Sequence, residues 1–116
     1  MANDAPLSFE HKAGKAPGTR ILTVTGPLTL RNIFELQSEL RSGELPRLSI
    51  LDLSGVPYMD SAGMGLVINH HVRTQNLGSK MIVVGVSPRV HELFKMTKVD
   101  TVISQAPTVE AAEAAL

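Results

Sequence analysis

The sequence contains no cysteine and no tryptophan, and its aromatic residues are limited to one tyrosine and three phenylalanines. The absence of cysteine excludes disulfides, a thiol nucleophile and a cysteine-based metal site, and it fits a reducing compartment. The scarcity of aromatic residues removes the stacking platforms with which many proteins hold single-stranded nucleic acids. We therefore expect neither a disulfide framework nor single-strand binding.

An excess of charge of either sign is also missing, because 11 lysines and arginines balance 11 aspartates and glutamates. No global electrostatic field therefore attracts nucleic acid or an anionic membrane surface. No apolar run approaches the length of a membrane span, and the N-terminal residues do not resemble a secretory signal. We expect a cytoplasmic protein without direct contact to nucleic acid or membrane.

Extended and helical patterns alternate along the 116 residues, a length typical of one domain. Two extended runs within residues 7–26 flank a loop rich in glycine and proline, which predicts a hairpin. Downstream, helices are predicted at 30–40, at 61–77, after Ser87-Pro88 and at 108–116, and strands at 47–54, 80–86 and 101–104. The sequence therefore predicts one α/β domain over residues 1–116. Its mixed, mostly parallel sheet starts with an N-terminal hairpin and is flanked by about four helices.

Apolar side chains on these elements are expected to form the core. They are Ile50, Leu53, Val67, Ile68, Ile82, Val84 and Leu93. On the helix at 61–77, His71 falls on the apolar stripe and is expected to be partly buried, whereas His70 is expected on a solvated face. Thr29 is expected to cap the helix at 30–40.

The most unusual segment is LDLSGVPYMDSAGMG at residues 51–65, which runs from a strand through a turn into a helix starting at Asp60 and Ser61. Such loops, at the carboxyl ends of strands, are where α/β sheets concentrate function. In the simplest interpretation, Asp60 or Ser61 is only the N-cap of the helix, which contributes about 1 kcal/mol. Gly63 and Gly65 add a second observation, because each costs about 0.8–1 kcal/mol relative to alanine in a helix. Two such glycines indicate that a neighbouring strand or a partner approaches the helix backbone closely.

A serine at the start of this helix is physically suited to carry phosphate. The free N–H groups and the positive end of the helix macrodipole favour an anion there. Phosphorylation of Ser61 would add about −1.5 to −2 charges beside Asp60 and change the local potential with little strain on the fold. Ser61 can therefore switch a binding surface by charge alone.

Three segments carry a resemblance to a known family: LDLSGVPYMDSAGMG, the strand KMIVVGV and the following SPRVHELFKMTKVD. The chain resembles, over essentially its whole length, the STAS domain of bacterial anti-sigma factor antagonists. The resemblance implies that Ser61 is phosphorylated by a partner kinase that is also the anti-sigma factor, with Asp60 as its acidic neighbour. It further implies that the unphosphorylated protein binds this partner and frees sigma, and that a serine phosphatase restores the binding form.

The surface that contacts the partner is expected to combine two loops, which should lie together because both precede helices that follow neighbouring strands. It is predicted to include Pro57, Tyr58, Met59, Asp60, Ala62, Gly63, Thr29 and Asn32. The family usually has an acidic or amide residue at the position of Thr29. This departure bears on which partner is bound.

Two other classes of function fit the sequence less well. A small serine hydrolase would need a base near Ser61, but His70 and His71 lie two turns further along the same helix and point away from its start. Met59 also stands where the G-x-S-x-G motif has its first glycine. The second class is an adaptor of the same fold in a transport or signalling complex, and the Asp60-Ser61 pair favours the phosphorylation switch over it.

No metal or cofactor site is predicted. The adjacent His70 and His71 diverge by about 100° around a helix and cannot easily share one ion. Neither G-x-G-x-x-G nor G-x-x-x-x-G-K-[ST] occurs, so the sequence lacks a phosphate-binding glycine loop. We therefore expect a regulator that is not an enzyme and that needs no metal or cofactor.

Overall fold

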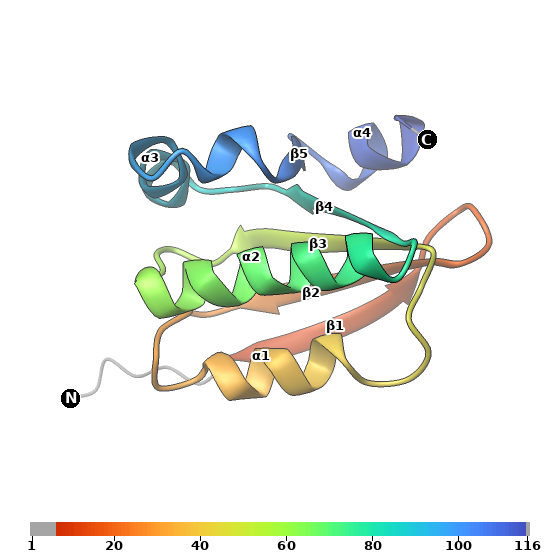
Figure 1. The fold of residues 1–116 in the computed structure, drawn as a ribbon, viewed down its shortest axis with the longest axis horizontal. Helices are drawn as coiled ribbons and strands as arrows, with labels where there is room; N and C mark the ends of the chain where they lie inside the picture. Colours follow the sequence, from red (N-terminus) through yellow and green to blue (C-terminus); the bar gives the residue numbers. More distant parts are fainter. Residues whose placement is uncertain (1–6, 116) are drawn as a thin grey trace.

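Strands and helices alternate along residues 7–115, the part of the chain that the computed structural model describes (Figure 1). The strands are β1 (Ser8–Ala13), β2 (Thr19–Thr25), β3 (Leu48–Gly55), β4 (Lys80–Val84) and β5 (Ser104–Ala106). The helices are α1 (Ile33–Leu40), α2 (Ser61–Asn76), α3 (Pro88–Met96), the short 3-10 helix η1 (Val99–Thr101) and α4 (Val109–Ala114). The predicted order of strands and helices is confirmed, and η1 is an addition that the sequence did not predict.

The five strands form one sheet in the order β1-β2-β3-β4-β5. β1 and β2 pair as an antiparallel hairpin, and every later neighbour pairs in parallel. Parallel neighbours need a crossover, and a helix supplies it after β2, β3 and β4. The mixed, mostly parallel sheet with an N-terminal hairpin is therefore confirmed.

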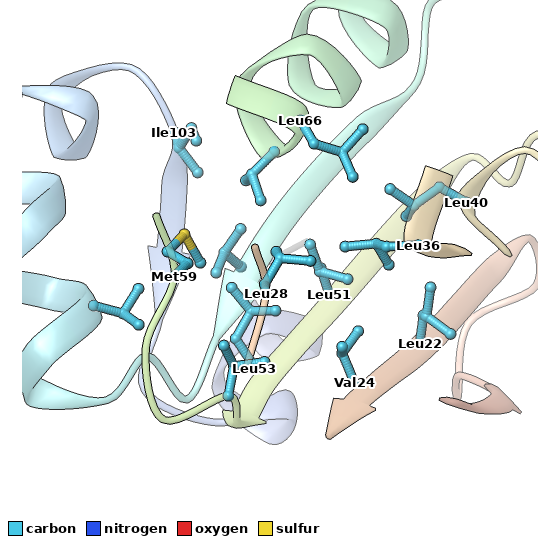
Figure 2. Packing of buried hydrophobic residues seen from close by; sticks show 14 of the residues in the cluster. Leu22, Val24, Leu28, Leu36, Leu40, Leu51, Leu53, Met59, Leu66 and Ile103 are labelled. Carbon is cyan, nitrogen blue, oxygen red and sulfur yellow. The ribbon is translucent and has the colours of Figure 1, made fainter. Parts of the chain in front are cut away.

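The main core lies between the sheet and the helices α1 and α2, which run side by side across one face (Figure 1). Figure 2 shows this cluster from close by. Its labelled members are Leu22, Val24, Leu28, Leu36, Leu40, Leu51, Leu53, Met59, Leu66 and Ile103. A smaller cluster on the opposite face packs Ala112 of α4 against apolar residues of β2, β3 and β4. Because β3 contributes to both clusters, its sequence is apolar on both faces.

Most of the predicted core is confirmed. Ile50, Leu53, Val67, Ile82 and Val84 are buried. Ile68 and Leu93 are only partly buried and pack against the edge of the main cluster. These two residues border the core because each lies on the flank of a helix whose inner stripe is filled by other side chains.

The start of α1 corrects the sequence interpretation, because the helix begins at Ile33 and Thr29 does not cap it. The side chain of Asn32 holds a turn instead: its Oδ1 accepts from the Thr29 N–H at 2.9 Å, and its Nδ2 donates to the Pro27 carbonyl at 2.7 Å. The turn leaves Leu30 and Phe34 exposed, at 65% and 69%. The spacing of apolar residues could not predict this start, because the polar side chain of Asn32 determines where the helix begins.

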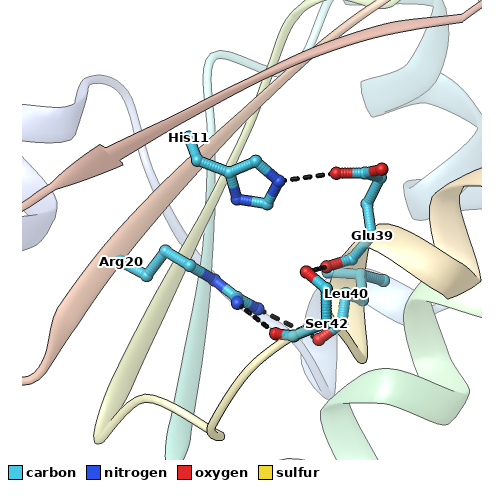
Figure 3. Close-up of polar contacts among 5 residues, drawn as sticks. All are labelled: His11, Arg20, Glu39, Leu40 and Ser42. Atoms are coloured by element: carbon cyan, nitrogen blue, oxygen red, sulfur yellow. Dashed lines mark hydrogen bonds and ion pairs between the residues drawn. The ribbon is translucent and has the colours of Figure 1, made fainter.

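The C-terminal end of α1 is tied to the hairpin by polar contacts (Figure 3). Arg20 of β2 donates to the carbonyl oxygens of Ser42 at 2.8 Å and Leu40 at 3.0 Å. His11 of β1 contacts Glu39, with 2.6 Å between Nε2 and Oε1. Arg20 thereby satisfies carbonyls that a helix end otherwise leaves without a partner.

His70 corrects a second expectation, because it is buried rather than solvated. His70 is 4% exposed and His71 is 6% exposed. Burial, together with the charges of Arg73, Arg20 and Arg41, lowers the pKa of His70 from 6.5 to about 4. His70 is therefore neutral at pH 7, and its position beside α1 could not be read from the pattern of α2 alone.

The low pKa of His70 predicts that acid weakens the fold. The unfolded chain takes up the proton near pH 6.5, whereas the folded chain takes it up only near pH 4, so the free energy of unfolding falls as the pH drops between these values. A shift of this size corresponds to about 3 kcal/mol. His70→Gln should lose less stability between pH 7 and pH 4 in urea unfolding than the parent protein does. Parallel stability curves for the two proteins would contradict the assignment.

Candidate functional site

Two loops meet at the carboxyl ends of β2 and β3. Residues 26–32 follow β2, and residues 56–60 follow β3. Leu28 and Met59 form a parallel bridge, in which the Leu28 N–H donates to the Tyr58 carbonyl at 3.1 Å and the Asp60 N–H donates to the Leu28 carbonyl at 3.2 Å. The expectation that these loops lie together is confirmed.

Asp60 joins the two loops to the start of α2. Its backbone is extended, and its Oδ1 accepts from the N–H of Gly63 at 3.0 Å, which makes it the N-cap of the helix. Its Oδ2 accepts from the N–H of Leu30 at 3.0 Å. Both carboxylate oxygens therefore have structural partners, and the capping role that the sequence left open between Asp60 and Ser61 belongs to Asp60.

The two glycines of α2 have different surroundings. A Cβ atom on Gly63 would lie 2.6 Å from the carbonyl oxygen of Leu28, so only glycine allows the loop backbone to come this close. A Cβ atom on Gly65 would meet no atom within 4 Å. The close approach that the sequence predicted is confirmed at Gly63, where a loop supplies it. At Gly65 the surface is open.

Ser61 is the first residue of α2 and is exposed, as predicted. The capping carboxylate of Asp60 occupies the N–H of Gly63, and the Asp60 carbonyl accepts from the N–H of Met64. The local backbone is thus held by bonds in which the Ser61 hydroxyl takes no part. A group added to this hydroxyl would meet the positive end of the α2 dipole.

The loop of residues 56–60 is also tied to α3. The hydroxyl of Ser87, the N-cap of α3, donates to the Pro57 carbonyl at 3.4 Å. The guanidinium of Arg89 lies 5.1 Å from the centre of the Tyr58 ring, a cation–π contact. Pro57 is exposed and Tyr58 is half-buried, so both remain available on the surface beside Ser61.

Three of the residues predicted for the partner surface lie in the interior, which corrects their expected exposure. Met59 is 7% exposed and points into the main core (Figure 2), because the bridge with Leu28 turns its side chain inward. Asn32 is 8% exposed and is engaged in its turn. Gly63 is buried under Leu28. Their contribution to this region is structural.

Residues that share the surface around Ser61 define what we call the Ser61 surface. It comprises Thr29, Leu30, Pro57, Tyr58, Asp60, Ser61 and Ala62. Thr29 and Ala62 are half-buried at its edge. The sequence predicted Leu30 as the start of a helix, whereas the structure places it in the loop before α1, where it is 65% exposed. The result is an exposed apolar side chain beside an exposed serine.

Neither His70 nor His71 is placed to act as a base for Ser61. His70 and His71 are buried and lie nine and ten positions along α2, about 14 Å from Ser61 along the helix axis. Within residues 7–115, no group of three or more His, Asp or Glu side chains is arranged to hold a metal ion. In the same part of the chain, no helix combines the length and apolar character needed to span a membrane.

Comparison with known proteins identifies the fold. A model of the STAS domain matches residues 12–112. A candidate anti-sigma factor antagonist from Thermotoga maritima has a TM-score of 0.84 at 20% identity, over 91% of this chain and 92% of that one. An anti-sigma factor antagonist from Mycobacterium paratuberculosis has a TM-score of 0.74 at 18% identity, over 98% and 96% of the two chains.

A transport-related protein shares the same fold. A sulfate transporter family protein from Wolinella succinogenes has a TM-score of 0.74 at 22% identity, over 84% of this chain and 83% of that one. At such identities the likeness shows the fold alone. The fold is therefore common to proteins named as regulators and to proteins named for transport, and the site has to distinguish between them.

The contrast between Gly63 and Gly65 gives a matched pair of substitutions. Gly63→Ala should destabilise the protein by more than about 1 kcal/mol, because the methyl group collides with the Leu28 carbonyl although alanine favours helices. Gly65→Ala should stabilise it by about 0.5–1 kcal/mol, because the added methyl group meets no atom. Urea unfolding of both variants measures the difference. Equal effects of the same sign would show that the loop does not press on α2 at Gly63.

Proposed function

The chain belongs to the STAS domain family, and from this premise we propose that it is a cytoplasmic anti-sigma factor antagonist switched by phosphorylation of Ser61. In this proposal the Ser61 surface binds an anti-sigma factor that is also a serine kinase. Phosphorylation by that kinase releases the complex, and a serine phosphatase restores the binding form. The observation that carries the proposal is an exposed serine at the first position of α2, directly after the Asp60 cap.

The composition of the Ser61 surface supports binding that depends on charge. Leu30 offers apolar area that a partner can cover, and the adjoining loop adds the half-buried Tyr58. Asp60 already places one carboxylate next to Ser61, and phosphate would add about −1.5 to −2 charges. A partner that covers this surface would have to remove water from an unmatched dianion, which is costly.

The rigidity of the loops supports a switch that acts without refolding. The Leu28–Met59 bridge and the two hydrogen bonds of the Asp60 carboxylate hold the backbone on both sides of Ser61. The phosphate oxygens would lie at the N-terminal end of α2, where the helix dipole favours an anion. We therefore expect phosphorylation to change the potential and shape of the surface and to leave the fold unchanged.

The alternative is an adaptor of the same fold in a transport or signalling complex outside sigma control. The shared fold of a sulfate transporter family protein is the observation that favours it. The Asp60-Ser61 pair at an exposed helix start favours the phosphorylation switch instead. A hydrolase is not proposed, because His70 and His71 are buried further along α2 and cannot act as a base for Ser61.

The partner can be identified by capture from the native host with unphosphorylated protein as bait. We expect a histidine-kinase-like ATPase in the bound fraction, lost when the bait is phosphorylated on Ser61. Bait with Gly63→Ala, which disturbs the start of α2, serves as a control for dependence on this site. Recovery of a transporter subunit in place of the ATPase would support the adaptor alternative.

Substitutions of Ser61 test the switch with purified partner. Ser61→Ala should keep the affinity of the unphosphorylated protein and resist the kinase, because it adds no charge. Ser61→Asp should weaken binding by at least about tenfold, since a buried unpaired charge costs more than about 1.4 kcal/mol. Thermal unfolding should change little in either variant.

The control for Ser61→Asp is Ser104→Asp, which adds the same charge to an exposed position on β5. This control should bind the partner as tightly as the parent protein does. The decisive measurement is the dissociation constant before and after stoichiometric phosphorylation of Ser61. Equal dissociation constants would rule out the switch and leave Ser61 as an ordinary first residue of the helix.

Leu30 tests the extent of the Ser61 surface. Leu30→Ser removes an exposed apolar side chain and should weaken partner binding by about tenfold. Burying a leucine side chain contributes about 1.5–3 kcal/mol, and the substitution loses part of this free energy of binding. Val102→Ser removes a similarly exposed apolar side chain, 55% against 65%, next to η1. It should leave the affinity unchanged. Equal losses from both substitutions, measured by calorimetry, would place the partner elsewhere.

A further inference from the structure

A groove of about 410 Å³ lies between α1 and α2, toward their C-terminal ends. Arg73, which lines it, comes twelve positions after Ser61 on α2, about 18 Å further along the helix axis. The groove is therefore separate from the Ser61 surface. Its polar lining consists of Arg41 and Arg73, His70, and the amides of Gln37, Asn69 and Asn76.

The charge of the groove is uniformly positive. Arg41 and Arg73 line it, and no acidic side chain does. Within residues 7–115, neither arginine has a carboxylate at ion-pair distance. A third cation, Arg20, lies close enough to act on His70, and its Nη1 and Nη2 donate to carbonyl oxygens at the end of α1 (Figure 3). Such a cluster of like charges without counter-charge favours an anion.

His70 senses the positive charge of the groove. The residue lines the groove and is 4% exposed, and its Nε2 is enclosed by protein atoms. Burial lowers the pKa of His70, and the charges of Arg73, Arg20 and Arg41 act in the same direction. Both groove arginines are thus among the charges that keep this ring neutral. An anion bound between them would oppose their effect on His70.

Helix capping is the simpler explanation for arginines near two helix ends, and the hydrogen bonds do not support it. Arg20 occupies the carbonyl of Leu40 at the end of α1. At the end of α2, the carbonyls of Arg73 and Thr74 accept from the N–H of Leu77, and that of Gln75 accepts from the N–H of Gly78. The terminal carbonyls thus have partners without Arg41 or the guanidinium of Arg73.

We propose that this groove binds a small organic phosphate monoester. Arg41 and Arg73 hold the phosphate dianion, because the planar guanidinium presents paired N–H donors that match phosphate oxygens. The buried His70 ring lies beside them and is affected by the charge of the bound phosphate. The amides of Asn69 and Asn76 and the apolar side chain of Leu66 line the space for the organic part. A volume of about 410 Å³ exceeds what a bare ion needs and lies in the range of small-molecule sites.

The test is a titration of the full chain with phenyl phosphate at constant ionic strength, followed by NMR of the His70 ring nitrogens and the backbone amides. We expect saturable shifts around the groove and a rise of the His70 pKa from about 4, since a bound anion favours the charged ring. Benzyl alcohol, which lacks the anion, should not bind. Inorganic phosphate should bind more weakly than phenyl phosphate, because it lacks the organic part.

Variants assign the binding to the groove. Arg41→Gln and Arg73→Gln should each raise the dissociation constant of phenyl phosphate at least tenfold, and Arg73→Lys should have a smaller effect because it keeps the charge. Lys95→Gln removes one positive charge from the exposed side of α3, outside the groove, and should change nothing. Circular dichroism checks that each variant is folded.

Three results would overturn the proposal. They are the absence of saturable shifts, an equal loss of affinity in Lys95→Gln and the arginine variants, and binding of benzoate as tight as that of phenyl phosphate. None of these results depends on the function of Ser61, because partner binding is not measured. Failure of the Ser61 switch would equally leave the groove experiment unaffected.

Discussion

The carboxylate of Asp60 is the contact on which the organisation of this molecule depends. One oxygen caps α2 and the other holds the Leu30 N–H, so a single side chain fixes a helix start and joins two loops that are about 30 residues apart in sequence. The Leu28–Met59 bridge completes the join and brings the Leu28 carbonyl against Gly63. The exposed position of Ser61 follows from this arrangement. Asp60 makes the hydrogen bonds that hold the loops and the helix start, and the Ser61 hydroxyl takes no part in them.

The order of elements was predictable because it rests on local patterns. Apolar periodicity, glycine and proline breaks and the Ser87-Pro88 helix start are properties of short segments, and the structure confirms the elements they predicted. The N-cap and the close contact at Gly63 were also predictable, because a helix rarely accepts glycine in its first turns without a reason.

The burial of Met59 and of His70 was not predicted because it depends on contacts between segments far apart in the chain. Met59 is buried because a bridge to Leu28 turns it inward, and His70 is buried because α1 packs beside α2. These contacts cannot be read from the neighbouring residues in sequence. The groove between α1 and α2 went unnoticed for the same reason, since its arginines are 32 positions apart. Leu30 is exposed for a local reason, because the turn held by Asn32 stops the helix from starting earlier.

The strand order has a consequence for how the chain folds during its synthesis. Each strand of the described sheet pairs with the strand that precedes it, and no later strand is inserted between two earlier ones. As the chain leaves the ribosome, every new strand therefore finds its neighbour already made, and loop closure involves short distances in sequence. The sheet can grow from the N-terminal hairpin by successive addition. An incomplete sheet of this kind never has open edges other than β1 and the strand added last, which limits the surface available for aggregation before the last strand is added.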